Sequence, residues 1–75
     1  MSNIVIMPKL GATMDEGKII RWFFSEGDFI AKGDPLFEVE SDKATLEVES
    51  PFEGTLLKIL IREGDIPVLE PVGVI

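Results

Sequence analysis

The stretch "EVESDKATLEVES", residues 38–50, reads as two short strands joined by a turn. In both strands acidic side chains occupy every second position, and apolar side chains occupy the positions between them. This period of two is typical of strands that bury one face and expose the other. The stretch therefore predicts a β-hairpin with Lys43 at its tip.

The register of the hairpin follows from its apolar positions, because only one pairing brings both apolar rows onto one face. The expected cross-strand pairs are Phe37 with Val48, Val39 with Leu46, and Glu38 with Glu47. The connection then has an even number of residues and is centred between Asp42 and Lys43. A two-residue turn favours glycine or asparagine at positive φ. We therefore expect a four-residue loop around a type I turn, with Asp42 early in it.

The composition indicates one small domain, residues 1–75. The chain has 75 residues, 45% of them hydrophobic, and no cysteine, so packing rather than disulfide bonds or a thiolate metal site must stabilise it. It has no histidine or tyrosine, so no imidazole can activate its hydroxyl groups as nucleophiles. We expect no catalytic residue. We also expect no metal site, because the alternating glutamates lack the closely spaced oxygen ligands of a calcium loop.

The net charge of −7 limits the partners of the domain. Phosphate binding requires a basic surface, so nucleic acid is not an expected partner, whereas a basic protein surface is. The apolar runs are too short to cross a membrane, and the start "MSNIVIMPKLG" lacks the features of a signal peptide. We expect a soluble protein of the bacterial cytoplasm, or of the mitochondrial matrix if a transit peptide was removed.

Glycine and proline recur at short intervals along the chain, which predicts many short strands. No segment shows helical periodicity over about eleven or more residues. The predicted fold class is therefore all-β. The expected strands are residues 3–7, 18–25, 36–41, 44–50 and 55–62, and the C-terminal "VGVI".

Two parts of the chain resemble each other. "GKIIRWFFSEGD" (17–28) aligns with "GTLLKILIREGD" (54–65), and both end in the same Glu-Gly-Asp turn. Each half is too small to bury its own apolar face, so the repeat predicts two similar sheets packed together about a pseudo-two-fold axis. Gly27 and Gly64 in the shared turns are expected at positive φ.

Strand alternation assigns the faces of the two repeats. The residues expected to meet in the core are Ile20, Trp22 and Phe24 from the first repeat, and Leu57, Ile59 and Ile61 from the second. Phe23 and Leu60 fall on the polar side in both repeats. We expect these two residues to lie under a loop or at a sheet edge.

The first half also carries an insertion. Nine positions separate Pro8 from Gly17, whereas three separate Pro51 from Gly54 at the equivalent place in the second half. The extra residues lie within "LGATMDEG" (10–17). We expect this segment to form an exposed loop, in which Gly11 allows a bend.

An exposed lysine beside an acidic sheet face is ordinarily a solvated surface residue, and the charges of such a face help to prevent edge-to-edge aggregation. Here the tip is a tight turn, the hairpin is central in a symmetric sandwich, and the chain lacks other reactive groups. A primary amine on a flexible four-carbon stem is a common target of covalent modification. Lys43 is therefore the candidate attachment site.

The turn Ser41-Asp42-Lys43-Ala44, within "EVESDKATLEVESPFEGTL", resembles the attachment motif of lipoyl domains. The resemblance covers nearly the whole chain. "MPKLGATMDEGKIIRW" (7–22) is similar to the opening of the family, and "GDPLFEVESDKAT" (33–45) is similar to its middle. Within the family the chain resembles the N-terminal lipoyl domain of dihydrolipoyl acyltransferases, from 2-oxo acid or acetoin dehydrogenase complexes. It would then be the N-terminal part of a longer acyltransferase subunit.

The resemblance implies a flattened barrel of two four-stranded antiparallel sheets, with lipoic acid joined to Lys43 by an amide. It implies a non-catalytic carrier. A thiamine-diphosphate-dependent decarboxylase would acylate the carrier reductively, an acyltransferase core would pass the acyl group to coenzyme A, and dihydrolipoyl dehydrogenase would reoxidise it.

The resemblance also implies which residues other proteins recognise. A lipoate ligase or lipoyl transferase would recognise the turn through Glu40, Ser41, Asp42 and Ala44. The residues implied in recognition by the decarboxylase are Leu10, Gly11, Ala12, Thr13, Met14, Asp15 and Glu16.

Two alternatives remain. Biotin carrier domains of carboxylases share the same superfamily, but they usually flank the lysine with methionines, whereas Asp42 and Ala44 stand here. The other alternative is an unmodified interaction module, for which an acidic β-sandwich would suffice.

Overall fold

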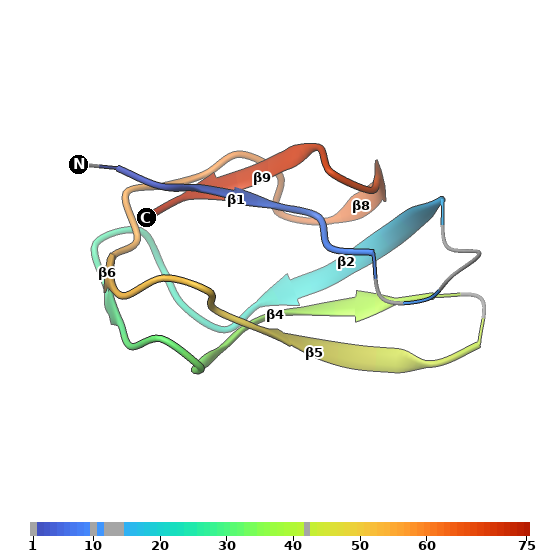
Figure 1. The fold of residues 1–75 in the computed structure, drawn as a ribbon, viewed down its shortest axis with the longest axis horizontal. Helices are drawn as coiled ribbons and strands as arrows, with labels where there is room; N and C mark the ends of the chain where they lie inside the picture. Colours follow the sequence, from blue (N-terminus) through green and yellow to red (C-terminus); the bar gives the residue numbers. More distant parts are fainter. Residues whose placement is uncertain (1, 10, 12–14, 42) are drawn as a thin grey trace.

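The computed structural model describes residues 2–9, 11, 15–41 and 43–75, which form β-strands and no helix (Figure 1). The strands are β1 (Ile4–Ile6), β2 (Glu16–Trp22), β3 (Phe29–Ile30), β4 (Pro35–Glu40), β5 (Thr45–Glu49), β6 (Gly54–Thr55), β7 (Lys58–Ile59), β8 (Gly64–Pro67) and β9 (Pro71–Val74). The prediction of an all-β fold is confirmed.

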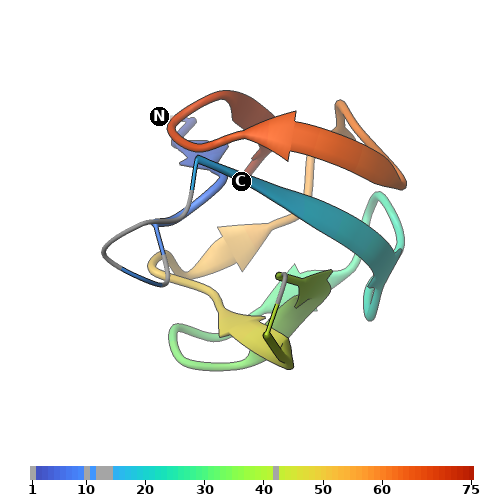
Figure 2. The same ribbon diagram turned by 90° about the vertical axis from the view of Figure 1, so that its right-hand side faces the viewer.

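The strands form two packed layers, which are seen end-on in Figure 2. One layer is a four-stranded antiparallel sheet of order β5-β4-β2-β8. The other contains the three-stranded sheet β1-β9-β7. The short pair β3-β6 continues this second layer, because β6 and β7 are consecutive pieces of one run of chain. The second layer therefore repeats the order of the first, as β1-β9-β7/β6-β3.

The register confirms the pseudo-two-fold relation. In the first sheet the pairing of β4 with β5 skips Leu36, and in the second the pairing of β9 with β1 skips Val72. Both side chains are fully buried. Each bulge follows the proline that opens its strand, so the two sheets share an irregularity as well as a strand order.

Trp22 joins the two sheets. It lies opposite Phe37 in the first sheet, and the ring centroids are 4.8 Å apart. Its indole Nε1–H donates a hydrogen bond of 2.7 Å to the carbonyl oxygen of Ile61, in the chain after β7. Its six-membered ring covers Gly73 of β9, where a Cβ atom would lie 2.8 Å from Trp22 Cη2 and 3.2 Å from the Lys58 carbonyl oxygen. Gly73 occupies the position equivalent to Phe37, so a glycine faces the indole on one side and a phenylalanine on the other.

The predicted alternation in the first repeat is wrong at one position. The pairing of β2 with β4 skips Ile20, so Ile19 rather than Ile20 lies on the buried face with Trp22. Ile19 is fully buried and Ile20 is half-buried. Phe24 lies beyond the end of β2 and packs partly buried against the core.

The expected strand over 55–62 is also wrong, because it is broken into β6 and β7. Leu56 is fully buried at the break, and Leu57, which was expected in the core, is 56% exposed. The Glu26 carboxylate accepts a hydrogen bond of 2.9 Å from the Ile59 backbone N–H. Ile59 itself is buried as predicted, and Ile61 packs partly buried against the core.

The remaining local predictions have mixed outcomes. Gly27 and Gly64 have φ of 98° and 118°, which confirms the predicted positive φ. Phe23 lies just past β2, half-buried beneath the Arg21 guanidinium at 5.0 Å, while Leu60 is exposed beyond β7. The strands β3 and β8 were not predicted, because two to four residues are too few to show alternation.

We expect Gly73→Ala to destabilise the fold by about 1–3 kcal/mol, because its Cβ atom would overlap the Trp22 ring and the ring cannot move without losing its hydrogen bond. Thermal and denaturant unfolding measure the change. Gly11→Ala is the matched control, since a Cβ atom there meets nothing within 4 Å. In a Trp22→Phe background, which removes the overlapping ring, Gly73→Ala should cost less. An equal cost in both backgrounds would contradict this account.

Candidate functional site

The hairpin that carries Lys43 is built from β4 and β5. Its register is the predicted one, with Phe37 opposite Val48 and Val39 opposite Leu46. The inward side chains of β4 are fully buried, and Val48 of β5 is buried as well. Leu46 was expected to point inward, but it is 42% exposed. It lies on β5, which is an edge strand of its sheet and has a neighbour on one side only. The part of the hairpin around Phe37 and Val48 is thus packed in the core, whereas Leu46, nearer the turn, is not.

The loop has four residues, as predicted. Glu40 and Thr45 form the last cross-strand pair, so residues 41–44 connect the strands. The Ser41 N–H donates a hydrogen bond of 2.8 Å to the Ala44 carbonyl oxygen, which closes the loop. The expected position of Asp42 early in the turn lies outside the described residues.

The Ser41 side chain organises this loop. Its hydroxyl oxygen accepts hydrogen bonds from the backbone N–H groups of Lys43 and Ala44, at 3.3 and 3.2 Å. The same hydroxyl donates to the Ala44 carbonyl oxygen at 3.1 Å. The Ser41 hydroxyl thereby uses its one hydrogen and both of its lone pairs in hydrogen bonds within the loop 41–44. The sequence signal was present, because a serine that opens a turn commonly bonds to the backbone ahead of it, but its role in fixing the turn was not predicted.

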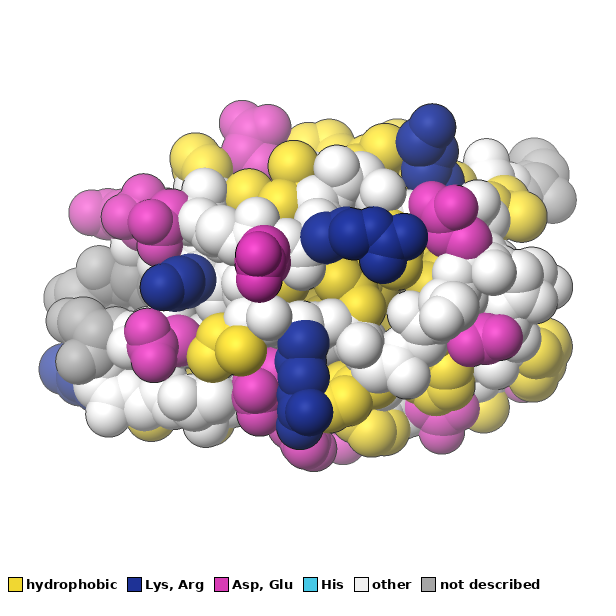
Figure 3. Space-filling model, turned by 180° about the vertical axis from the view of Figure 1, so that it is seen from behind, with side chains coloured by type: hydrophobic (Ala, Val, Ile, Leu, Met, Phe, Trp, Pro, Cys, Tyr) yellow, Lys and Arg dark blue, Asp and Glu magenta, His cyan; other side chains and the backbone are white. Residues whose placement is uncertain are grey.

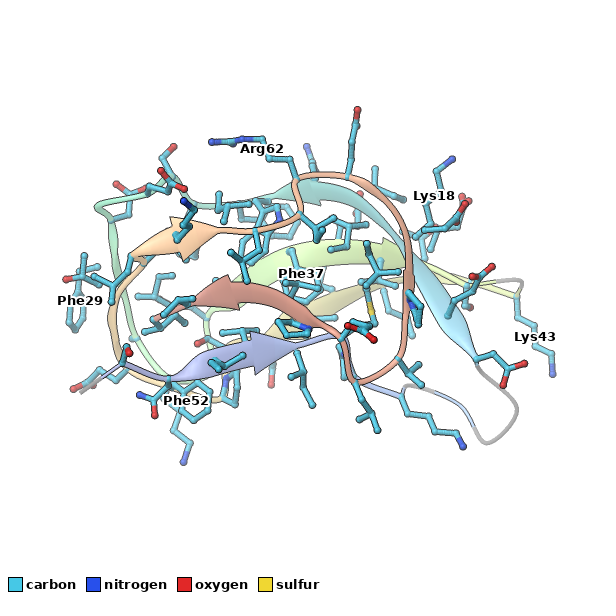
Figure 4. All side chains as sticks on the ribbon, turned by 90° about the horizontal axis from the view of Figure 1, so that it is seen from above. Lys18, Phe29, Phe37, Lys43, Phe52 and Arg62 are labelled. Carbon is cyan, nitrogen blue, oxygen red and sulfur yellow. The ribbon has the colours of Figure 1, made fainter. Side chains whose placement is uncertain are left out.

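The Lys43 side chain extends outward from the end of the molecule, away from the body of the sheets (Figure 4). The residue is exposed, as is the neighbouring Ala44. The backbone that carries the amine is therefore fixed by hydrogen bonds, while the stem and its nitrogen lie in solvent. An acyl group joined to the nitrogen would need no displacement of a described side chain.

Glu40 and Lys18 flank the turn on its β2 side. Glu40 is exposed at the end of β4, and Lys18 of β2 lies directly opposite it. Lys18 was not singled out from the sequence. Its place depends on the register between β2 and β4, which includes the bulge at Ile20.

The segment 10–17, expected to be an exposed loop, is described only in part. Leu10, Ala12, Thr13 and Met14 lie outside the described residues. Gly11 and Asp15 are exposed, and the Asp15 carbonyl oxygen accepts a hydrogen bond of 2.9 Å from the Val68 N–H. Glu16 and Gly17 do not belong to a loop, because β2 begins at Glu16, which is exposed and pairs with Pro67. Since Lys18 lies opposite Glu40, Glu16 lies at the hairpin end of the molecule.

The surface around the hairpin is acidic. Glu38 and Glu47 lie opposite each other, as predicted, and the Arg21 guanidinium lies 3.6 Å from the Glu38 carboxylate. On the face shown in Figure 3, basic side chains are scattered among acidic ones and form no continuous basic patch. Within the described residues, no group of three or more acidic side chains is placed to hold a metal ion. The described chain also contains no helix long and apolar enough to span a bilayer.

Comparison with known proteins gives the family. Residues 3–70 match the profile of the biotin/lipoyl family, described as "Biotin-requiring enzyme". The chain is 47% identical over 73 residues to the dihydrolipoyllysine-residue acetyltransferase component of the pyruvate dehydrogenase complex of Rickettsia bellii, covering 95% of this chain and 18% of the relative. It is 48% identical over 68 residues to the mitochondrial component of the same name from Caenorhabditis elegans, covering 88% of this chain and 13% of the relative.

A third relative has a different name. It is the pyruvate dehydrogenase E1 component subunit beta of Rhizobium meliloti, 48% identical over 60 residues, which cover 80% of this chain and 13% of that protein. The chain thus spans less than a fifth of the length of these relatives. The profile match over most of the chain and the barrel of two related sheets agree, and the chain belongs to the biotin/lipoyl-attachment family.

Proposed function

We propose that this chain is a lipoyl carrier domain, with a lipoyl group joined by an amide to Nζ of Lys43. The observation that carries the proposal is the position of Lys43, exposed on a hydrogen-bonded four-residue loop at one end of a packed barrel. The membership of the family and the names of the acetyltransferase relatives support it.

In this proposal the chain contributes position and electrostatics. The barrel fixes the two ends of the loop through the pair of Glu40 with Thr45, and the Ser41 hydroxyl holds the N–H groups of Lys43 and Ala44. The lysine stem provides the flexible part of the arm. Amide formation removes the positive charge of the amine, which makes the net charge of −7 one unit more negative. The turn then presents an acidic surface to basic partners.

When bound, a lipoyl group supplies a dithiolane that accepts an acyl group and two electrons at one enzyme and delivers them to others. We infer that a thiamine-diphosphate-dependent decarboxylase of a 2-oxo acid dehydrogenase complex loads the carrier. An acyltransferase core would unload it to coenzyme A, and dihydrolipoyl dehydrogenase would reoxidise it. Tethering favours such a relay, because it raises the local concentration of the carried group at each site. The domain itself would perform no catalysis.

The parent of the domain is also a proposal. The acetyltransferase relatives favour a dihydrolipoyl acyltransferase subunit of the pyruvate type. The E1 beta relative indicates that a similar segment also occurs in a subunit of another name. The role proposed for the hairpin is the same in either parent subunit, because it depends on this domain and not on the rest of the subunit.

Incubation with lipoate ligase, ATP and lipoate should add one lipoyl group, and fragment mass spectrometry should place it on Lys43. Lys43→Arg should abolish the addition while Lys18→Arg leaves it intact, because Lys18 projects from β2 rather than from the turn. Addition at another lysine, or none to the folded chain, would refute the proposal. Biotin ligase with biotin tests the alternative, and biotinylation without lipoylation would make this a biotin carrier.

Ser41→Ala should slow lipoylation about fivefold, the factor that corresponds to the loss of roughly 1 kcal/mol of hydrogen bonding in the turn. The ligase reads the turn in a fixed conformation, and this variant removes the hydroxyl that fixes it. Ser25→Ala is the control, since in the turn that follows β2 the backbone N–H of Ser25, and not its hydroxyl, bonds to the Asp28 carboxylate. The rate of mass increase and the melting temperature are both measured. Equal rates for the two variants at unchanged stability would show that the hydroxyl does not position the lysine.

Glu16→Lys should lower reductive acylation by the decarboxylase roughly threefold without changing lipoylation, because a charge at the rim of an interface acts mainly on association. Glu16 is exposed at the hairpin end, where a partner that visits Lys43 must dock. Glu53→Lys makes the same change of charge beside β6, at the other end of the barrel. If both variants lose acylation equally, net charge and not the 10–17 segment governs recognition.

A further inference from the structure

Two open strand edges border a seam between the sheets. β5 is the last strand of one sheet and β1 is the last strand of the other, and the pseudo-two-fold relation makes them equivalent. Both strands line one groove of about 410 Å³. An open strand edge presents unpaired backbone groups, which can accept a further strand.

The backbone of β1 directs such groups into the seam. Asn3 exchanges hydrogen bonds of 2.6 and 2.8 Å with Ile75, and Met7 bonds to the segment just before β9. In an antiparallel ladder successive residues point their N–H and C=O groups to opposite sides. The groups of Ile4 and Ile6 therefore point away from β9, and the described residues supply no other strand beside them.

The two edges differ in their side chains. β5 carries Glu47 and Glu49, whose charges discourage pairing with another strand. The equivalent positions of β1 are Ile4, 59% exposed, and Ile6, 41% exposed. One edge is thus protected by carboxylates, while its counterpart exposes β-branched apolar side chains that favour a neighbouring strand.

The groove beside β1 is apolar. Its lining includes Ile4, Ile6, Pro8 and Phe52, with Val48 below, and Glu49 is its one charged residue among those described. Figure 4 shows Phe52 beside β1. A shallow groove of apolar side chains next to free backbone groups has the features of a site for strand addition, in which backbone pairing gives affinity and the groove takes alternate side chains.

We propose that the β1 edge binds an extended segment of a partner protein in which apolar and basic residues alternate. The open N–H and C=O groups of Ile4 and Ile6 can pair with an extended strand, which makes a strand the fitting occupant. The groove accepts the apolar side chains, and Glu49 together with the net charge of −7 selects basic side chains at the other positions. A second copy of this chain fits poorly, because it brings another −7 to the contact. The site does not involve Lys43 and does not depend on the carrier role.

The test uses the ¹⁵N-labelled 75-residue chain and the synthetic peptide acetyl-KVKIKVK-amide. Saturable shifts should occur in β1 and around Phe52, and hydrogen exchange should slow at the amides of Ile4 and Ile6 but not at Val5, which already pairs with β9. The acidic peptide acetyl-EVEIEVE-amide should not bind. Shifts without slowed exchange at Ile4 and Ile6 would overturn strand addition, as would the absence of binding.

A double variant with a matched control separates the site from general hydrophobicity. Ile4→Thr with Ile6→Thr keeps strand propensity and removes the exposed apolar surface, so it should weaken binding about tenfold. Leu57→Thr with Leu60→Thr makes a comparable change at exposed leucines elsewhere on the barrel and should leave binding within about twofold. Equal weakening by both variants would overturn the proposal. A dimer seen by sedimentation without peptide, and lost in the isoleucine variant, would replace it with self-association.

Discussion

The contacts of Trp22 hold the two sheets in register. Its ring packs on Phe37 of its own sheet and covers Gly73 of the other, and its indole N–H bonds to the Ile61 carbonyl beyond β7. An aromatic ring shared by two layers contributes both burial and a directional bond. A domain of 75 residues with no cysteine has few other means of fixing the layers. The packing of the hairpin's sheet against the other sheet therefore depends on Trp22, which lies in the neighbouring strand β2 of the same sheet.

The candidate site depends on this packing of the two sheets, because a long flexible arm is useful only on a fixed base. The apolar face of β4 is buried completely, and the loop that follows is closed by the Ser41 bonds. The two termini lie at the other end of the barrel from the turn between β4 and β5 (Figure 1). The backbone N–H groups of Lys43 and Ala44 are thus held by the Ser41 hydroxyl, while the Lys43 side chain lies in solvent.

The hairpin and its loop length could be predicted from sequence because alternation is unbroken from Phe37 to Val48 apart from the turn itself. Alternation failed where the structure departs from a regular ladder. The bulge at Ile20 shifts the buried face to Ile19, and the expected strand over 55–62 breaks where the chain changes its pairing from β3 at β6 to β9 at β7. Both departures depend on contacts with residues distant in the chain, which a local pattern does not contain. The position of Lys18 opposite Glu40 could not be predicted for the same reason, because it depends on the pairing of β2 with β4.

The two halves of the barrel differ in the side chains of their equivalent edge strands, β5 and β1. Equivalent strands carry the same bulge and the same order, yet β5 exposes glutamates where β1 exposes isoleucines. Stability of the barrel does not demand this difference, because both rows lie outside the core. The carboxylates of Glu47 and Glu49 discourage pairing of β5 with another strand. The isoleucines of β1 have no such effect, and the strand addition proposed above would give their exposed side chains a contact.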